Sequence, residues 1–193
     1  MTDTKITIFR NTKAGQIALV LGVVGLLVFT IAPWWAGRAD LRLFGEFFLY
    51  LSLASLWNWL AGYSGLVSVG QQAFVGFGGY VLFGATILLG VHPIVAILMA
   101  AVLGAVVAIP VATLIFRLRG AYFAIGTWVI AEVTRLSITQ WKQLGGGTGT
   151  SLPRSATKNM WGVEWIKDLL DVKTSAARDI LAYWLALIWA VLT

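Results

Sequence analysis

The side chains in this chain that could do chemistry are few, and two of them form a pair. Glu132 and Arg135 are three residues apart in a mostly apolar run. Residues at this spacing share one face of a helix, so the two charges can form an ion pair. An ionised carboxylate near the middle of a membrane costs at least about 2.5 to 3.5 kcal/mol, which makes such a partner necessary. The pair is either a structural ion pair between helices or part of the lining or gate of a solute path.

A second set of candidates lies in the uncharged stretch GYSGLVSVGQQAFVGFGGY at 62–80, which carries six glycines. Lipid cannot satisfy irregular backbone groups, so we expect this helix break to be buried in protein or to line a cavity. Ala73, Gly76 and Gly79 recur every three residues and could let helices approach closely. Alternatively, free N–H groups and Gln side chains could face a solute path, and the two uses can coexist. The candidates for the path or the break are Ser64, Ser68, Gln71, Gln72, Gly76 and Gly79.

Several other kinds of chemistry are not expected. The chain has no Cys and one His, so neither a nucleophile paired with a base nor a metal centre can be assembled, and we predict no catalytic residue and no metal site. The run GGGTGTS at 145–151 lacks the Lys of a phosphate-binding loop, so we expect no cofactor on this chain. The net charge is +6, but the basic residues are scattered and build no nucleic-acid stripe.

The elements that must position these residues are membrane helices. The composition is 59% hydrophobic and 11% charged, whereas soluble proteins average about 25% charged residues. A helix needs about 20 mainly apolar residues to cross the bilayer. We therefore predict an all-α polytopic bundle with five complete spans and a truncated sixth, which is too short to cross. The predicted spans lie near residues 16–35, 41–61, 71–90, 94–116, 121–141 and 180–193.

Basic residues near the first span predict the orientation of the chain. Lys5, Arg10 and Lys13 precede this span, and positive flanks stay in the cytoplasm. We therefore expect a cytoplasmic N-terminus and an external segment at 142–179, although that segment is itself rich in basic residues and the inverted topology is the alternative. Within it, NMWGVEWIKDLLD at 159–171 has an amphipathic pattern. It predicts a helix that lies on the membrane surface or packs on other loops of the protein.

Three motifs in order resemble one protein family. GYSGLVSVGQQAFVGFGGY, RLRGAYFAIGTWVIAEVTRL at 117–136 and GGGTGTSLP at 145–153 are similar to the LivM-type permease subunit of branched-chain amino acid ABC importers. Members commonly carry His where this chain has Gln71, and an acidic and a basic residue recur at the positions of Glu132 and Arg135. Members also continue with further spans, so the resemblance implies that 1–193 is the N-terminal part of a single permease domain. In the family an external loop corresponds to Gly145, Gly146, Gly147 and Thr148.

The resemblance also implies partners and a function. Such a subunit lies in the lipid bilayer of the cell inner membrane and pairs with a second related permease, two cytoplasmic ATPase subunits and an external solute-binding protein. ATP is then hydrolysed on the ATPases, and the solute is a branched-chain or similar amino acid, whereas relatives carry urea or short amides. Two other classes remain as alternatives: a passive channel for a small neutral solute such as urea, and a membrane scaffold in which the glycines only pack.

Overall fold

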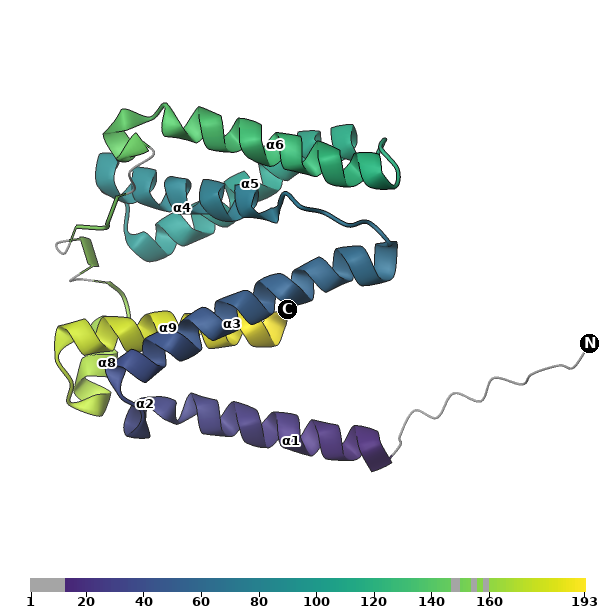
Figure 1. Cartoon of the computed structure of the whole chain (residues 1–193). Coiled ribbons are helices and arrows are strands. Elements are labelled where there is room, and N and C mark those ends of the chain that lie inside the picture. The colour runs from purple at the N-terminus through teal and green to yellow at the C-terminus, as the bar shows by residue number, and fades with distance from the viewer. Residues whose placement is uncertain (1–12, 147–149, 154–155, 158–159) are drawn as a thin grey trace, which may run out of the picture.

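The computed structural model describes residues 13–146, 150–153, 156–157 and 160–193 (Figure 1). Every regular element in these residues is a helix. The elements are α1 (Lys13–Thr30), α2 (Ala32–Trp35), α3 (Arg38–Asn58), a π-helical turn (Trp59–Tyr63), α4 (Gln71–Leu88), α5 (Pro93–Ile115), α6 (Ala121–Thr139), a 3-10 turn (Lys142–Leu144), α8 (Val163–Leu170) and α9 (Thr174–Leu192). The prediction of an all-α fold is therefore confirmed for the described part of the chain.

The helices form two groups. In Figure 1, α4, α5 and α6 lie together, while α3 packs against α9 with α1, α2 and α8 around them. The apolar core belongs to the second group, where Phe48 of α3 and Tyr183 of α9 are buried. The Tyr183 hydroxyl donates to the Phe29 carbonyl of α1 at 2.6 Å, so the polar group of this buried side chain has a hydrogen-bond partner. α3, α5 and α9 begin at one end of the molecule, and α4 and α6 begin at the other end (Figure 1).

Within the described part of the chain, three helices are long and apolar enough to cross a membrane, namely α4, α5 and α9. The predicted spans near 71–90 and 94–116 correspond to the first two. The prediction that the last span is too short is wrong, because α9 begins at Thr174 and has 19 residues. The first turns of α9 carry polar side chains, so the apolar run in the sequence did not indicate that they belong to the helix. They are helical because Ala176 and Ala177 are buried against the rest of the core.

The remaining predicted spans differ in detail. α1 ends at Thr30 and α2 follows as a separate turn, since Pro33 cannot continue the hydrogen bonds of the preceding helix. The apolar part of α1, Gly15–Thr30, is shorter than a full span. α3 and α6 have 21 and 19 residues but carry charged side chains and do not reach the hydropathy of the other three. The count of five complete spans therefore stays a prediction.

The amphipathic helix α8 packs within the protein, which is one of its two predicted arrangements, while contact with the membrane surface stays a prediction. Val163 and Ile166 are 1% exposed and pack into the core beside α9, which confirms packing within the protein. Trp161 and Trp165 lie outside this core and are 65% and 62% exposed. Tryptophan favours the boundary between water and hydrocarbon, so these rings are available to the membrane surface.

Candidate functional site

The predicted helix break between α3 and α4 is present. α3 ends in the π-helical turn, and residues 65–70 have no helical structure before α4 begins at Gln71. Gly65 has φ +66°, a conformation that glycine adopts at no steric cost. The break is held by side chains of other elements: Trp57 Nε1 donates to the Ser68 carbonyl at 2.8 Å, and Val69 N donates to Thr127 Oγ1 at 3.1 Å.

The stretch 62–70 was expected to be buried in protein or to line a cavity, and within this chain it is buried only in part, while Ser68 and Gly70 line a cavity. Only Gly70 is buried, whereas Ser64 is exposed and Tyr63 is 84% exposed. The reason is that the break connects the two helix groups and leaves its outer side without any described neighbour (Figure 1). Any shelter for this part of the break must come from lipid headgroups, water or another chain.

The glycines of α4 make no close helix contact within this chain, and their packing against another chain stays a prediction. A Cβ placed on Gly76 or Gly79 would meet no atom within 4 Å, so these two glycines do not permit a close helix approach within this chain. The close approach is at Gly70, where an added Cβ would lie 2.3 Å from the Thr127 carbonyl oxygen of α6. The α4–α6 contact therefore depends on the glycine that immediately precedes α4.

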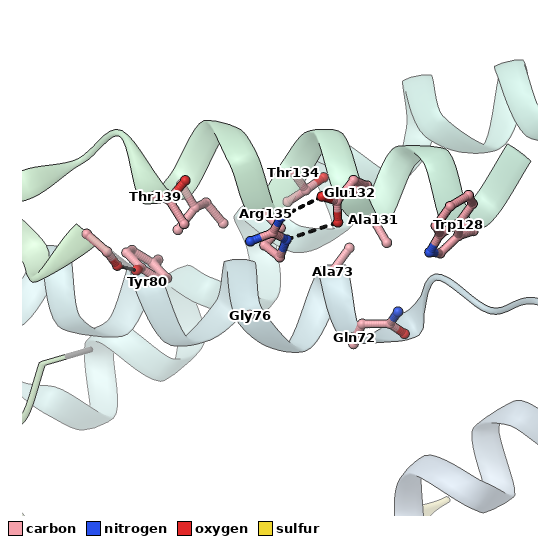
Figure 2. Close-up of a pocket in the computed structure, with 12 residues that line it drawn as sticks. Gln72, Ala73, Gly76, Tyr80, Trp128, Ala131, Glu132, Thr134, Arg135 and Thr139 are labelled. Atoms are coloured by element: carbon pink, nitrogen blue, oxygen red, sulfur yellow. Dashed lines mark hydrogen bonds and ion pairs between the residues drawn. The ribbon is translucent and has the colours of Figure 1, made fainter. Parts of the chain in front are cut away.

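Open space beside Gly76 belongs to a cavity of about 470 Å³ between α4 and α6 (Figure 2). α4 contributes residues between Gln72 and Tyr80, and α6 contributes its charged face. In Figure 2, Gln72 and Trp128 lie at one end of the cavity and Tyr80 lies at the other. The lining consists of Gln72, Ala73, Gly76, Tyr80, Trp128, Ala131, Glu132, Thr134, Arg135, Ile138, Thr139 and Gly146.

Glu132 and Arg135 form the predicted ion pair. Arg135 Nε donates to Glu132 Oε2 at 2.9 Å, and the Arg135 Nη2 group lies 2.5 Å from Oε1, which makes the contact bidentate. Both residues belong to α6, so the pair does not join two helices as the structural alternative supposed. Their side chains are 42% and 61% exposed and face the cavity (Figure 2). Among the described residues, neither makes an ion pair with another helix.

The loop after α6 closes the other end of the cavity. Tyr80 Oη donates to the Gly146 carbonyl at 2.5 Å, and Leu144 is 2% exposed beside Gly84 of α4. Gly145 has φ +83° and Gly146 has φ +52°, which lets the chain turn back toward α4. Gly147 and Thr148, which were predicted in the same external loop, lie outside the described residues.

The candidate path residues divide between two cavities. Gln72 and Gly76 line the cavity with the ion pair, whereas Ser68 and Gln71 line a second, mainly apolar cavity of about 500 Å³ under the helix break. The Gln71 side-chain amide can be oriented so that both its nitrogen and its oxygen have partners. The nitrogen then donates to the Ser68 carbonyl at 3.1 Å, and the oxygen accepts from Trp57 Nε1 at 3.2 Å. Gln71 thus supports the break, and Gln72 is the glutamine beside the ion pair. Ser64 and Gly79 line neither cavity.

Two residues of the site, Thr127 and Tyr80, were missed at the sequence level. Thr127 Oγ1 holds the break, and it is 58 residues away from its partner Val69. Nothing local in the sequence indicates this contact. Tyr80 is the last residue of the glycine-rich stretch at 62–80. A tyrosine inside an apolar helix indicates a hydroxyl group that requires a hydrogen-bond partner.

The hydrogen bond from Tyr80 to the loop gives a direct prediction. The Tyr80→Phe variant should loosen the loop after α6, because a neutral hydrogen bond contributes about 0.5 to 1.5 kcal/mol. We expect trypsin to cleave after the exposed Lys142 about fivefold faster in this variant at unchanged helix content. The matched control is Tyr63→Phe, which removes the hydroxyl of a side chain that is 84% exposed. Equal cleavage rates in the two variants would contradict the assigned role of Tyr80.

No group of three or more His, Cys, Asp or Glu side chains in the described residues could hold a metal ion. The cavity wall between α4 and α6 carries one ion pair among otherwise uncharged residues, and its donor and acceptor groups are suited to binding a polar solute.

Comparison with protein families places this geometry in a wider context. The family model for the permease component of branched-chain amino acid transport systems matches residues 41–192, which is most of the chain. Comparison with curated proteins and with solved structures gave no match. The match begins within α3 and includes the helix break, both cavities and α9. The chain therefore belongs to the family of permease components of branched-chain amino acid transport systems.

Proposed function

We propose that this protein is a membrane-spanning permease subunit of an ABC importer for branched-chain or similar amino acids. The family match supports the class of transporter, and the apolar helices support the membrane location. In this proposal the chain works with a second related permease, two cytoplasmic ATPases that hydrolyse ATP and an external solute-binding protein. It lies in the inner membrane with a cytoplasmic N-terminus, and rocking of the paired permeases switches access to the solute.

The observation that carries the proposal is the ion pair that faces the α4–α6 cavity. An amino acid carries both a carboxylate and an ammonium group, and the Glu132–Arg135 pair offers one complementary charge to each. Arg135 can bind a carboxylate through two parallel hydrogen bonds. The cavity of about 470 Å³ lies within the range of about 300 to 1,000 Å³ that is common for small-molecule sites. A solute can therefore replace the contact between the two side chains with contacts of its own.

Copurification together with uptake tests this proposal. A tagged form of the chain, expressed from its natural gene neighbourhood, should copurify with two ATPase subunits and a second permease. Uptake of labelled leucine into vesicles should then require ATP and the external binding protein. A homo-oligomer without a nucleotide-binding partner that passes urea would instead support the passive channel.

The exposed helix break gives a further prediction. The chain has no native Cys, so single cysteines at Tyr63, Ser64 and Val67 can be labelled against a clean background. All three positions are exposed in the chain alone. Because irregular backbone inside a membrane must be sheltered, we expect a water-soluble thiol reagent to react with them at least about tenfold more slowly in the assembled importer than in the isolated chain.

The control for this labelling is a cysteine at Arg119, which is exposed in the turn between α5 and α6 at the same end of the molecule. It should react at similar rates in both preparations. Equally rapid labelling of positions 63, 64 and 67 from the cytosol in the assembled importer would show that the break is an ordinary water-exposed turn. It would then have no role in a path through the membrane.

A further inference from the structure

A third cavity, which has a polar wall, lies at the end of the molecule where α3, α5 and α9 begin. It has a volume of about 680 Å³ and is separate from the cavity between α4 and α6. Arg38 and Arg42 of α3 and Arg178 and Asp179 of α9 form its polar wall. Helix N-termini carry partial positive charge, so the backbone of this end adds to the charge of the arginines.

The charges on this wall do not balance. Asp179 accepts hydrogen bonds from Arg38 and Arg42, with Oδ2 2.5 Å from Arg38 Nη2 and 3.1 Å from Arg42 Nη2. The Asp179 side chain is only 18% exposed, whereas those of Arg38 and Arg42 are 50% and 63% exposed. Two guanidinium groups thus share one carboxylate while a third, Arg178, lines the same cavity, and Arg38 and Arg42 keep N–H donors available on their exposed sides.

Arg178 provides an independent indication of a ligand. Its Nη1 group donates to Thr157 Oγ1 at 2.6 Å, but its Nε is buried and has no hydrogen-bond partner among the described residues. A buried donor without a partner costs free energy, more so when the group is charged. Because Arg178 lines the cavity, a turn of its side chain toward an acceptor oxygen bound there would satisfy this group.

An apolar wall continues from the arginines along the helices. Ile97 of α5 and Leu181 and Leu185 of α9 line the same cavity. Ile97 and Leu185 are 43% and 42% exposed, so they offer apolar surface between the two helix groups. Since α5 and α9 are both long and apolar enough to cross a membrane, this surface extends toward the hydrocarbon. A ligand that fits both walls has an anionic head and an apolar tail.

We propose that this cavity binds an anionic phospholipid, with its headgroup phosphate on Arg38, Arg42 and Arg178 and an acyl chain along Ile97, Leu181 and Leu185. Arginine forks match phosphate oxygens in two parallel hydrogen bonds, and the exposed donors of Arg38 and Arg42 are available for such contacts. The bound lipid joins the two helix groups at the end where α3 and α9 meet α5. The proposal depends only on the membrane location of the chain and not on the solute that it transports.

The test uses the full chain purified in a neutral detergent, with lipid binding followed by native mass spectrometry. We expect dioleoyl phosphatidylglycerol to bind in preference to dioleoyl phosphatidylcholine. The Arg178→Gln variant should bind phosphatidylglycerol about tenfold more weakly, because it loses a charged donor to the phosphate. The matched control is Arg117→Gln, which removes an exposed arginine at the opposite end and should leave the affinity unchanged.

A second variant should change the affinity in the opposite direction. Asp179→Asn removes the carboxylate that competes with the lipid phosphate for Arg38 and Arg42, so we expect tighter binding of phosphatidylglycerol. A variant that merely misfolds cannot give this result, which keeps the proposal testable if Arg178→Gln proves unstable.

Four outcomes would overturn the proposal. The first is equal binding of the two lipids, and the second is an equal loss of affinity in Arg178→Gln and Arg117→Gln. The third is full competition by inorganic phosphate or glycerol 3-phosphate at the concentration at which the lipid binds, since this would assign the site to a soluble anion. The fourth is weaker binding in Asp179→Asn, since this would show that the carboxylate supports the site and does not compete with a lipid phosphate.

Discussion

Uptake of the transported amino acid is expected to fall at least about tenfold in a Glu132→Gln variant, while the permease still assembles with its partners. Both groups of the ion pair lie on α6 and face the cavity, so the pair is not required to join two helices. Loss of the carboxylate leaves Arg135 without its bidentate partner and leaves the solute ammonium without a counter-charge. A hydrogen bond to a charged group contributes about 1.5 to 3 kcal/mol, which corresponds to a factor of ten or more.

The measurement compares initial uptake rates with the amount of ATPase that copurifies. Glu46→Gln is the matched control, because Glu46 is an exposed carboxylate on α3 outside this cavity and its variant should transport at the normal rate. Arg135→Gln should reduce uptake to a similar degree, and the double variant should lose little more than either single one, since the two groups act as a unit. Failure of the Glu132→Gln chain to assemble would instead assign the pair a purely structural role.

The second large effect is expected on stability, in a Gly70→Ala variant. The φ of Gly70 is −103°, a negative value that is open to alanine, so the main cost of the substitution arises from lack of space. The new Cβ would lie 2.3 Å from the Thr127 carbonyl oxygen and 2.9 Å from its carbonyl carbon. These are backbone atoms of α6 that cannot move without the helix. Overpacking of this kind typically costs about 1 to 3 kcal/mol, and separation of α4 from α6 would also break the bond from Val69 N to Thr127 Oγ1.

Thermal unfolding of the purified chain in detergent, followed by circular dichroism, measures this effect. The matched control is Gly76→Ala on α4, where the added methyl group meets no atom within 4 Å and alanine favours the helix. We expect a clearly lower midpoint for Gly70→Ala and an unchanged or higher midpoint for Gly76→Ala. Equal midpoints would show that α6 yields easily at this contact and that the helix break is not held against Thr127.

The sequence by itself determined the features that depend on neighbouring residues. Apolar composition predicted membrane helices, because the free energy of transfer to lipid is a sum over side chains. The spacing of Glu132 and Arg135 predicted their ion pair, because residues three apart on a helix are adjacent whatever surrounds them. The glycine-rich, uncharged stretch predicted the helix break, and the positive φ of Gly65 gives the physical reason for glycine there.

Only the tertiary structure decided which residues meet across helices. It placed Gly70 against Thr127, turned the ion pair toward a cavity rather than another helix, and joined Asp179 to arginines about 140 positions earlier. It also extended α9 back to Thr174, because two polar turns gained a buried face beside α3 and α8. Such contacts depend on the angle and depth at which whole helices pack. Local periodicity carries no information on this angle or depth, because both are determined by contacts between residues that are far apart in the chain.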